Sequence, residues 1–346
     1  MTEVLPAQSL VLNFGGCAVV VETPDQAIVG RLRRYFRGFA EELEGRHRAR
    51  TQIRVVEEPA LENDPDMIAW SEGSKETFRE LDHGRLIRKV RTGVSIIIQD
   101  DTWSSSWTMR GPVGRNFSQL VNLIGNAYGL EIMDRGGAMI HASAVCLGDA
   151  RTVAVMGQSG LGKSSIAVRL MEQGFDYISN DRVVLEPSLL DPSIHAHGLP
   201  KLPRVNPGTL LSGEKTRFVL DASRRDRYEG LSREELWQVE DKHDLEVEGV
   251  LGRRWLLSGD LSVALVLNWR QDGEGLQLQR LTADQALHEL KLVRKTFGVF
   301  DLRLISRTDT ALAETVRRVP VYRVTGKADP ARLARELREG RLPELA

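Results

Sequence analysis

One glycine-rich stretch has residue types and spacing that point directly to chemistry. It matches the pattern G-x-x-x-x-G-K-[ST], which binds nucleotide phosphates when it joins a strand to a helix. Its residues are Gly157, Gln158, Ser159, Gly160, Leu161, Gly162, Lys163 and Ser164, followed by Ser165. Glycines let the backbone wrap closely around a phosphate with its N–H groups pointing inward. We expect Lys163 to reach the β- and γ-phosphates and Ser164 to bind Mg²⁺.

The sequence on either side of this stretch favours a phosphate-binding loop over a chance match in a glycine-rich turn. An apolar strand is predicted over residues 152–156, and a helix with an apolar stripe over residues 164–173. The motif occurs in kinases, hydrolases and switches alike, so it predicts nucleotide binding and leaves the reaction open.

Asp181 is the candidate for a second metal ligand. It lies 18 residues beyond Lys163, just after a strand predicted over residues 177–179. A parallel strand would place its carboxylate beside the loop, where it could bind Mg²⁺ directly or through water. A simple turn residue is the alternative, because Asn-Asp is common in turns. Asn268, after another predicted strand, carries no charge, so Asp181 is favoured.

Three further polar residues are weaker candidates. His141 lies early in a strand predicted over residues 139–147, where a lone histidine is more often packed than functional. Lys201 and Arg204 lie in the proline-rich segment 186–217, which cannot form a long helix. Two cations on a semi-rigid loop could close over a γ-phosphate or bind an acceptor, whereas the alternative is a solvated loop.

The pattern of predicted strands and helices that must position these residues indicates two domains. Residues 1–115 form a smaller, β-rich α+β domain in which we recognise no chemical constellation. Residues 116–346 begin with a predicted helix over 116–135 and continue with the strand, loop and helix of the motif. Further helices are predicted over 282–297 and 330–339. The fold class is therefore α/β.

Composition limits the class of partner. The 346 residues carry 47 Lys and Arg against 48 Asp and Glu, a net charge of −1, which argues against bulk binding to nucleic acid or anionic membrane. No apolar run approaches the roughly 20 residues that span a bilayer, and the first residues do not have the pattern of a signal peptide. We expect a cytoplasmic protein in which Cys17 and Cys146 are buried thiols.

Three segments together resemble the HPr kinase/phosphorylase family in motif and in order. They are His141-Ala142-Ser143-Ala144, the loop 157–165, and Ser179-Asn180-Asp181-Arg182-Val183. Residues 198–209 are similar to a divergent, HPr-kinase-related subgroup, so the resemblance indicates a related kinase rather than an enzyme that acts on HPr. It implies a P-loop nucleotide core akin to that of phosphoenolpyruvate carboxykinase, ATP and Mg²⁺ as cofactors, and phosphate transfer to a serine hydroxyl.

The resemblance also implies roles for individual residues. Lys163 and Ser164 keep their places in the loop, Asp181 matches the second family carboxylate, and His141 matches a histidine near the transferred phosphate. Asn180 stands where the family has its first carboxylate, the base for the acceptor proton, and an amide cannot take up a proton. Reverse phosphorylase activity is therefore not expected. Glu248, in place of a family arginine, indicates a different acceptor or active-site rim.

The function expected from the sequence is an ATP- and Mg²⁺-dependent kinase that phosphorylates a hydroxyl on a protein or peptide. His141, Lys163, Asn180 and Asp181 would be catalytic, with Ser164 and Asp181 on the metal. Two alternatives stay open. One is a nucleotide-binding regulatory or scaffold protein without transfer activity, and the other is a kinase of free serine or a related small alcohol. The sequence does not identify the acceptor or the oligomeric state.

Overall fold

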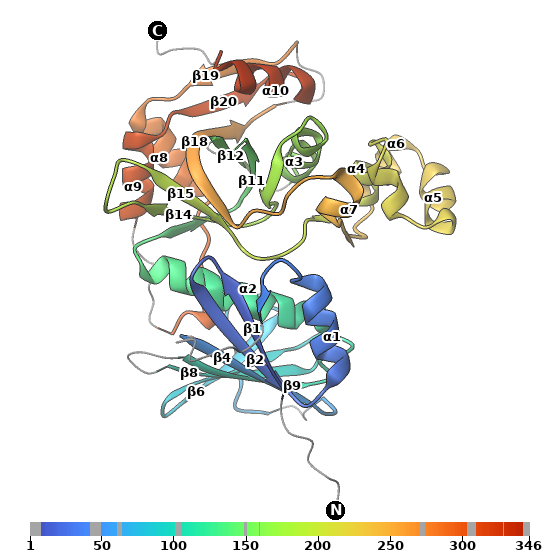
Figure 1. Ribbon diagram of the computed structural model, residues 1–346, viewed down its shortest axis with the longest axis vertical. Coiled ribbons are helices and arrows are strands. Elements are labelled where there is room, and N and C mark those ends of the chain that lie inside the picture. Colours follow the sequence, from blue (N-terminus) through green and yellow to red (C-terminus); the bar gives the residue numbers. More distant parts are fainter. Residues whose placement is uncertain are drawn as a thin grey trace, which may run out of the picture. The chain divides into compact units, whose positions relative to one another are not determined.

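Two compact units make up the chain in the computed structural model (Figure 1). The first comprises Met1–Glu131 and Thr296–Ser306, and the second Ile132–Lys295 and Arg307–Ala346. The structure describes residues 8–41, 50–60, 64–100, 105–148, 151–158, 160–269, 274–302, 309–327 and 329–341. The sequence predicts a domain boundary at residue 115, before helix α2, Phe117–Asp134. The two compact units instead divide after Glu131, near the end of that helix.

The N-terminal unit is built on one mixed sheet with the strand order β3-β1-β2-β4-β9-β8-β7-β6-β5. The strands of this sheet are β1 Gln8–Phe14, β2 Cys17–Thr23, β3 Ala40–Glu41, β4 Thr51–Glu57, β5 Ile68–Ala69, β6 Glu76–Leu81, β7 Gly84–Lys89, β8 Val94–Asp100 and β9 Ser105–Gly111. The unit also contains helix α1 Gln26–Tyr35 and the short 3-10 turn η2 Gly298–Phe300. The ring of Phe14 lies 5.6 Å from the rings of Phe36 and Tyr128, which joins the sheet to α2. Neither α2 nor any other described helix has the length and apolarity needed to cross a bilayer.

The C-terminal unit contains a second mixed sheet, in the order β10-β14-β15-β18-β12-β11-β13, with β20 and β19 added beside β18. Its strands and main helices are β10 Ala138–Ile140, β11 Ala142–Leu147, β12 Arg151–Met156, α3 Lys163–Glu172, β13 Asp176–Ser179, β14 Val183–Pro187, β15 Ile194–Gly198, β18 Ser258–Leu267, β19 Gln277–Arg280, α8 Ala283–Leu292, α9 Thr310–Arg318, β20 Val321–Thr325 and α10 Pro330–Glu339. This mixture of large sheets and helices confirms the predicted α/β class.

Alternating side chains of the central strands fill two cores, one on each face of this sheet. Val153 and Val155 of β12 pack with Leu170 of α3 and with α10. Ala154 and Met156 face the other way and pack with α8 and α9. Because successive strand residues point to opposite faces, an almost uninterrupted apolar strand has helices on both sides. This packing fixes β12 and α3, the two elements that flank the glycine-rich loop in the sequence.

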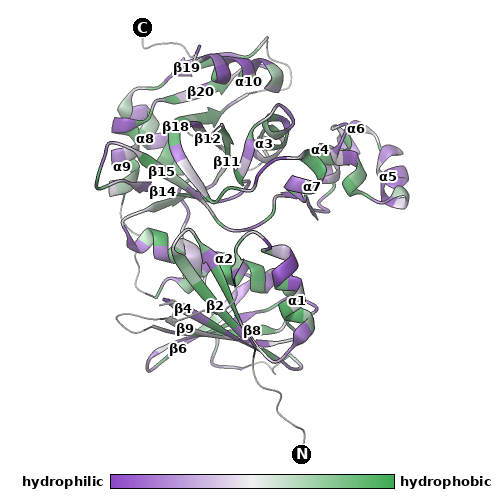
Figure 2. Ribbon diagram, in the orientation of Figure 1, coloured by the Kyte–Doolittle hydropathy of each residue, from purple (hydrophilic) through white to green (hydrophobic). Residues whose placement is uncertain are grey.

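A helical insertion connects β15 to β18. Its elements are β16 Arg204–Val205, α4 Pro207–Leu211, the 3-10 turn η1 Thr216–Val219, α5 Ala222–Glu229, α6 Arg233–Gln238, β17 His243–Asp244 and α7 Val247–Leu251. As predicted, the prolines of residues 186–217 leave only short elements. A capping box formed by Ser232 and Glu235 begins α6. Figure 2 shows that α5 is mostly hydrophilic.

Two predicted elements are shorter in the structure. The strand over 139–147 bends at His141, which separates β10 from β11. The helix over 282–297 ends at Leu292, because the next residues pair with β10 through hydrogen bonds that join His141 to Val293 and Lys295 to Met139. The helices over 116–135 and 330–339 are confirmed within two residues. Cys17 and Cys146 are both buried thiols, as predicted.

Replacing a core residue of α3 should destabilise the C-terminal unit. We expect Leu170→Ala, at a position with 0 % exposure, to cost about 2–5 kcal/mol through lost burial and a residual cavity. The matched variant Gln173→Ala, at the exposed C-cap of the same helix, should change stability by about 0.5 kcal/mol or less. Urea unfolding measures both. Equal losses in the two variants would contradict the packing of α3 on this sheet.

Candidate functional site

Strand ends at one edge of the C-terminal sheet bring the three predicted motifs together. β11 begins at Ala142 beside Met156, the last residue of β12, so His141 lies next to the start of the glycine-rich loop. β13 ends at Ser179 beside Ala144 of β11. Asn180 and Asp181 therefore follow β13 at the same edge. β13 runs in the same direction as β12, as predicted for Asp181, but β11 lies between them.

The glycine-rich loop joins β12 to α3, as the motif requires. Gly157 has φ +149°, and a side chain there would meet the carbonyl oxygen of Leu267 at 3.0 Å. Gly162, the N-cap of α3, has φ +81°, in the left-handed region that favours glycine. The loop therefore leads directly into the positive end of a ten-residue helix. Ser159 lies outside the described residues.

Lys163 lies at the first turn of α3 and folds back over the loop. Its Nζ donates hydrogen bonds to the carbonyl oxygens of Gly157 and Gln158, each at 2.9 Å. Burial lowers the pKa of Lys163, the nearby Asp181 carboxylate opposes that shift, and the positive charge of Lys295 adds to it. The ammonium group is thus held at the loop by backbone dipoles, where a phosphate would supply the missing negative charge.

The carbonyl oxygen of Asn180 connects the motifs. It accepts hydrogen bonds from the hydroxyl of Ser143, at 3.1 Å, and from the hydroxyl of Ser164, at 3.3 Å. Through these two bonds the segment after β13 is fixed to β11 and to the first turn of α3. The side-chain amide of Asn180 donates to the carbonyl oxygen of Arg204 at 3.2 Å. In this arrangement the amide holds a neighbouring loop instead of serving as a proton acceptor.

His141 and Asp181 are paired. The Nδ1 atom of His141 lies 2.8 Å from the carbonyl oxygen of Asp181 and 3.3 Å from its carboxylate. A carbonyl oxygen can only accept, so Nδ1 carries the proton and Nε2 is the acceptor nitrogen of the neutral ring. Burial raises the pKa of Asp181, but the hydrogen bond from His141 and the charges of Arg182 and Lys201 outweigh it and lower the pKa to about 2.

Ser164 and Asp181 offer the kind of oxygen donors that Mg²⁺ binds. The Asp181 side chain is 59 % exposed, so its ionised carboxylate is accessible to a ligand. The Ser164 hydroxyl gives its proton to Asn180, which leaves its oxygen lone pairs for a cation. The chemistry of these two donors fits a magnesium ion.

The residues between Leu199 and Thr209, which we call the strap, are anchored to the site at three places. The hydroxyl of Tyr177 donates to the carbonyl oxygen of Lys201 at 2.8 Å. Asn180 holds Arg204, as described above, and the hydroxyl of Thr209 hydrogen-bonds that of Ser165 at 2.6 Å. The strap therefore runs from the end of β13 to the start of α3.

The two cations predicted on the strap have different surroundings. Burial and the charge of Arg204 lower the pKa of Lys201, whereas Asp181 raises it, so Lys201 lies within electrostatic reach of the paired carboxylate. Arg204 instead pairs with Asp244 of β17 at 3.4 Å. The structure thus brings Lys201 to the predicted site and directs Arg204 to the insertion.

Two residues near the loop were not predicted. Trp269 follows β18, which runs parallel to β12, and its indole N–H donates to the carbonyl oxygen of Leu161 at 2.9 Å. An aromatic residue directly after a buried strand was the available signal. The positive charge of Lys295 helps to lower the pKa of Lys163. Its position depends on the pairing of its backbone with β10, which the local sequence does not reveal.

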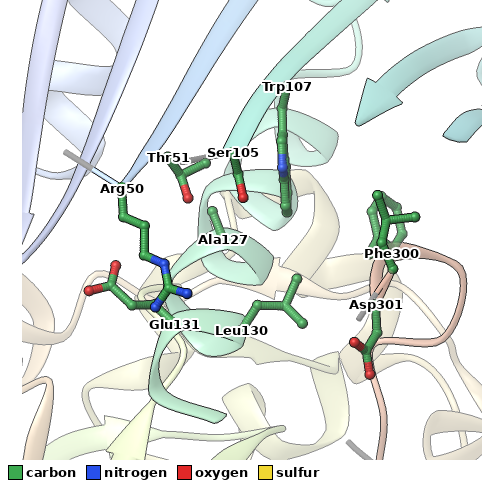
Figure 3. Close-up of a pocket in the computed structure, with 10 residues that line it drawn as sticks. Arg50, Thr51, Ser105, Trp107, Ala127, Leu130, Glu131, Phe300 and Asp301 are labelled. Atoms are coloured by element: carbon green, nitrogen blue, oxygen red, sulfur yellow. The ribbon is translucent and has the colours of Figure 1, made fainter. Parts of the chain in front are cut away.

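A small hollow belongs to the N-terminal unit alone and contains none of the predicted site residues (Figure 3). It is lined by Arg50, Thr51, Ser105, Trp107, Ala127, Leu130, Glu131, Phe300, Asp301 and Leu302. The indole nitrogen of Trp107 is buried there without a hydrogen-bond partner among the described residues. The hollow is a feature separate from the candidate site.

Comparisons with known proteins add little to this geometry. No protein-family model matches the chain, and no curated protein matches it. Among solved structures, the HPr(Ser) kinase/phosphatase from Coxiella burnetii matches with a TM-score of 0.32 and 10 % identity, over 59 % of this chain and 95 % of that chain. Similarity at this level carries no functional argument, so the proposal below rests on the residues of the site.

Removing one anchor of the strap should loosen it. Tyr177→Phe deletes the hydrogen bond to Lys201, a loss of about 1 kcal/mol, and we expect amide hydrogen exchange in residues 199–209 to become about fivefold faster. Tyr322→Phe in β20 is the matched control, because that hydroxyl makes no hydrogen bond to the described residues. Unchanged strap exchange in Tyr177→Phe would contradict the anchoring.

Proposed function

We propose that the chain is an ATP- and Mg²⁺-dependent phosphotransferase that passes the γ-phosphate to a hydroxyl group of a protein or peptide. The observation that supports this most strongly is the meeting of the glycine-rich loop, His141 and Asp181 at one edge of the sheet. Serine is the acceptor expected from the resemblance to HPr-kinase-related sequences.

Each part of the site has a role in this proposal. The loop amides and the N-terminus of α3 bind the phosphates, and Lys163 neutralises charge on the β- and γ-phosphates. Ser164 and Asp181 hold Mg²⁺, which when bound neutralises the phosphate oxygens and orients them. The low pKa of Asp181, about 2, keeps its carboxylate ionised at neutral pH, so it suits a metal ligand better than a proton acceptor.

His141 is the residue best suited to take the acceptor proton. Its Nδ1–H is committed to Asp181, which leaves Nε2 to accept a proton from the substrate hydroxyl. The acceptor oxygen forms a bond to the γ-phosphorus while the bond between that phosphorus and the β–γ bridging oxygen breaks. ADP leaves, and the proton passes from the hydroxyl to His141. Positioning and charge neutralisation supply most of the catalysis in such reactions.

The contact of Asn180 with the strap favours a second candidate function, nucleotide binding without transfer. With its amide bonded to Arg204, Asn180 neither supplies a base nor points to a reverse phosphorylase reaction. A strap anchored beside the loop in this way could respond to bound nucleotide, as in a regulatory protein. Tight ATP binding by the intact protein, without turnover on any acceptor, would favour this second function.

Loss of the loop lysine should abolish both binding and transfer. We expect Lys163→Ala to remove transfer of ³²P from γ-labelled ATP to the acceptor, tested with Mg²⁺ and the proteins encoded by neighbouring genes. The control is Lys327→Ala, an exposed lysine outside the site, which should label acceptor as the wild type does. Transfer that persists in Lys163→Ala would contradict the proposed site.

Loss of the proposed proton acceptor should separate chemistry from binding. His141→Gln is expected to lower kcat by about 10²–10⁴-fold, the usual contribution of general base catalysis. Its ATP affinity should stay within about twofold of the wild type, because the loop and Lys163 are unchanged. Single-turnover kinetics and titration calorimetry measure the two effects. A variant with normal kcat would show that His141 is structural.

A further inference from the structure

The segment that follows α8 is fixed beside the predicted site by its backbone. Val293, Arg294 and Lys295 run antiparallel to β10, with Arg294 paired to Ile140. The amide of His141 donates to the carbonyl oxygen of Val293 at 2.7 Å, and the amide of Lys295 donates to that of Met139 at 2.8 Å. Lys295 is therefore held next to the strand that ends at His141.

Unlike the nearby cations Lys291 and Arg294, Lys295 has no carboxylate partner among the described residues. Lys291 and Arg294 both pair with Asp309. Lys295 is exposed, and no carboxylate in the described part of the chain lies within ion-pair distance of it. A cation in this position is available to an anionic ligand.

Lys295 also lies within electrostatic reach of the phosphate loop. The backbone pairing places Lys295 two residues from Val293, whose carbonyl oxygen accepts from the amide of His141, and His141 lies next to the start of the loop. An anion bound between the ammonium groups of Lys295 and Lys163 would be attracted by both charges. The loop amides surround the inner phosphates of a nucleotide, so the terminal phosphate is the part most accessible to a second cation from outside the loop.

We propose that Lys295 binds the terminal phosphate of the nucleotide and so makes the site selective for triphosphate over diphosphate. The inference rests on the proposed function. Lysine acts here as a point charge toward phosphate oxygens, and it reaches them from a segment that carries no recognised motif. The strand pairing at Met139 sets its position, and Lys163 provides the matching cation on the loop side.

Nucleotide titration calorimetry of the full chain with Mg²⁺ tests this inference. The probes are a non-hydrolysable ATP analogue and ADP. We expect Lys295→Ala to weaken binding of the ATP analogue about tenfold, the loss of one charge-assisted hydrogen bond, and to leave ADP within about twofold. Lys291→Ala, four residues earlier in α8 and paired with Asp309, is the control and should change neither affinity.

The outcomes separate the two proposals. Equal losses for ADP and for the ATP analogue, or no loss for either, would overturn the role of Lys295 while nucleotide binding stands. A wild-type protein that binds neither nucleotide would contradict the proposed function itself, and the inference with it. Unchanged ADP affinity in Lys295→Ala also shows that the variant is folded.

Discussion

One carbonyl oxygen, that of Asn180, holds the candidate site together. By accepting from Ser143 and Ser164 it ties the end of β13 to the start of β11 and to the first turn of α3. The amide of the same residue holds the strap through Arg204. A backbone acceptor of this kind is indifferent to residue type, so these two hydrogen bonds do not depend on which side chain stands at position 180.

Positive charge is concentrated around the candidate site, although the chain as a whole is nearly neutral. The chain as a whole has a net charge of −1, yet Asp181 is affected by the positive charges of Arg182 and Lys201 and by a hydrogen bond from His141, and Lys163 by the charge of Lys295. Positive charges concentrated in this way suit a ligand with several negative charges, such as a nucleoside triphosphate. Near-neutral composition therefore excludes a generally basic protein but is compatible with a concentrated phosphate site.

Local signals made part of this site predictable, and long-range pairing made the rest unpredictable. The loop, α3 and α10 follow from glycine spacing, apolar periodicity and the proline at the start of α10, all of which act within a few residues. The early end of α8 depends on the pairing of Lys295 with Met139, about 150 residues away in the sequence. The position of Lys295 and the bend at His141 depend on the same long-range pairing, whereas Trp269 carries a local signal, an aromatic residue just after an apolar strand.

The central claim is that the backbone of the glycine-rich loop binds nucleotide phosphates, and amide chemical shifts test it most directly. In ¹⁵N-labelled protein titrated with ATP and Mg²⁺, we predict that the amides of Gly160, Gly162 and Lys163 move strongly downfield, because each N–H gains a charged acceptor. The amides of α10 serve as the reference and should stay in place. Loop amides that do not move at saturating ATP would contradict the account.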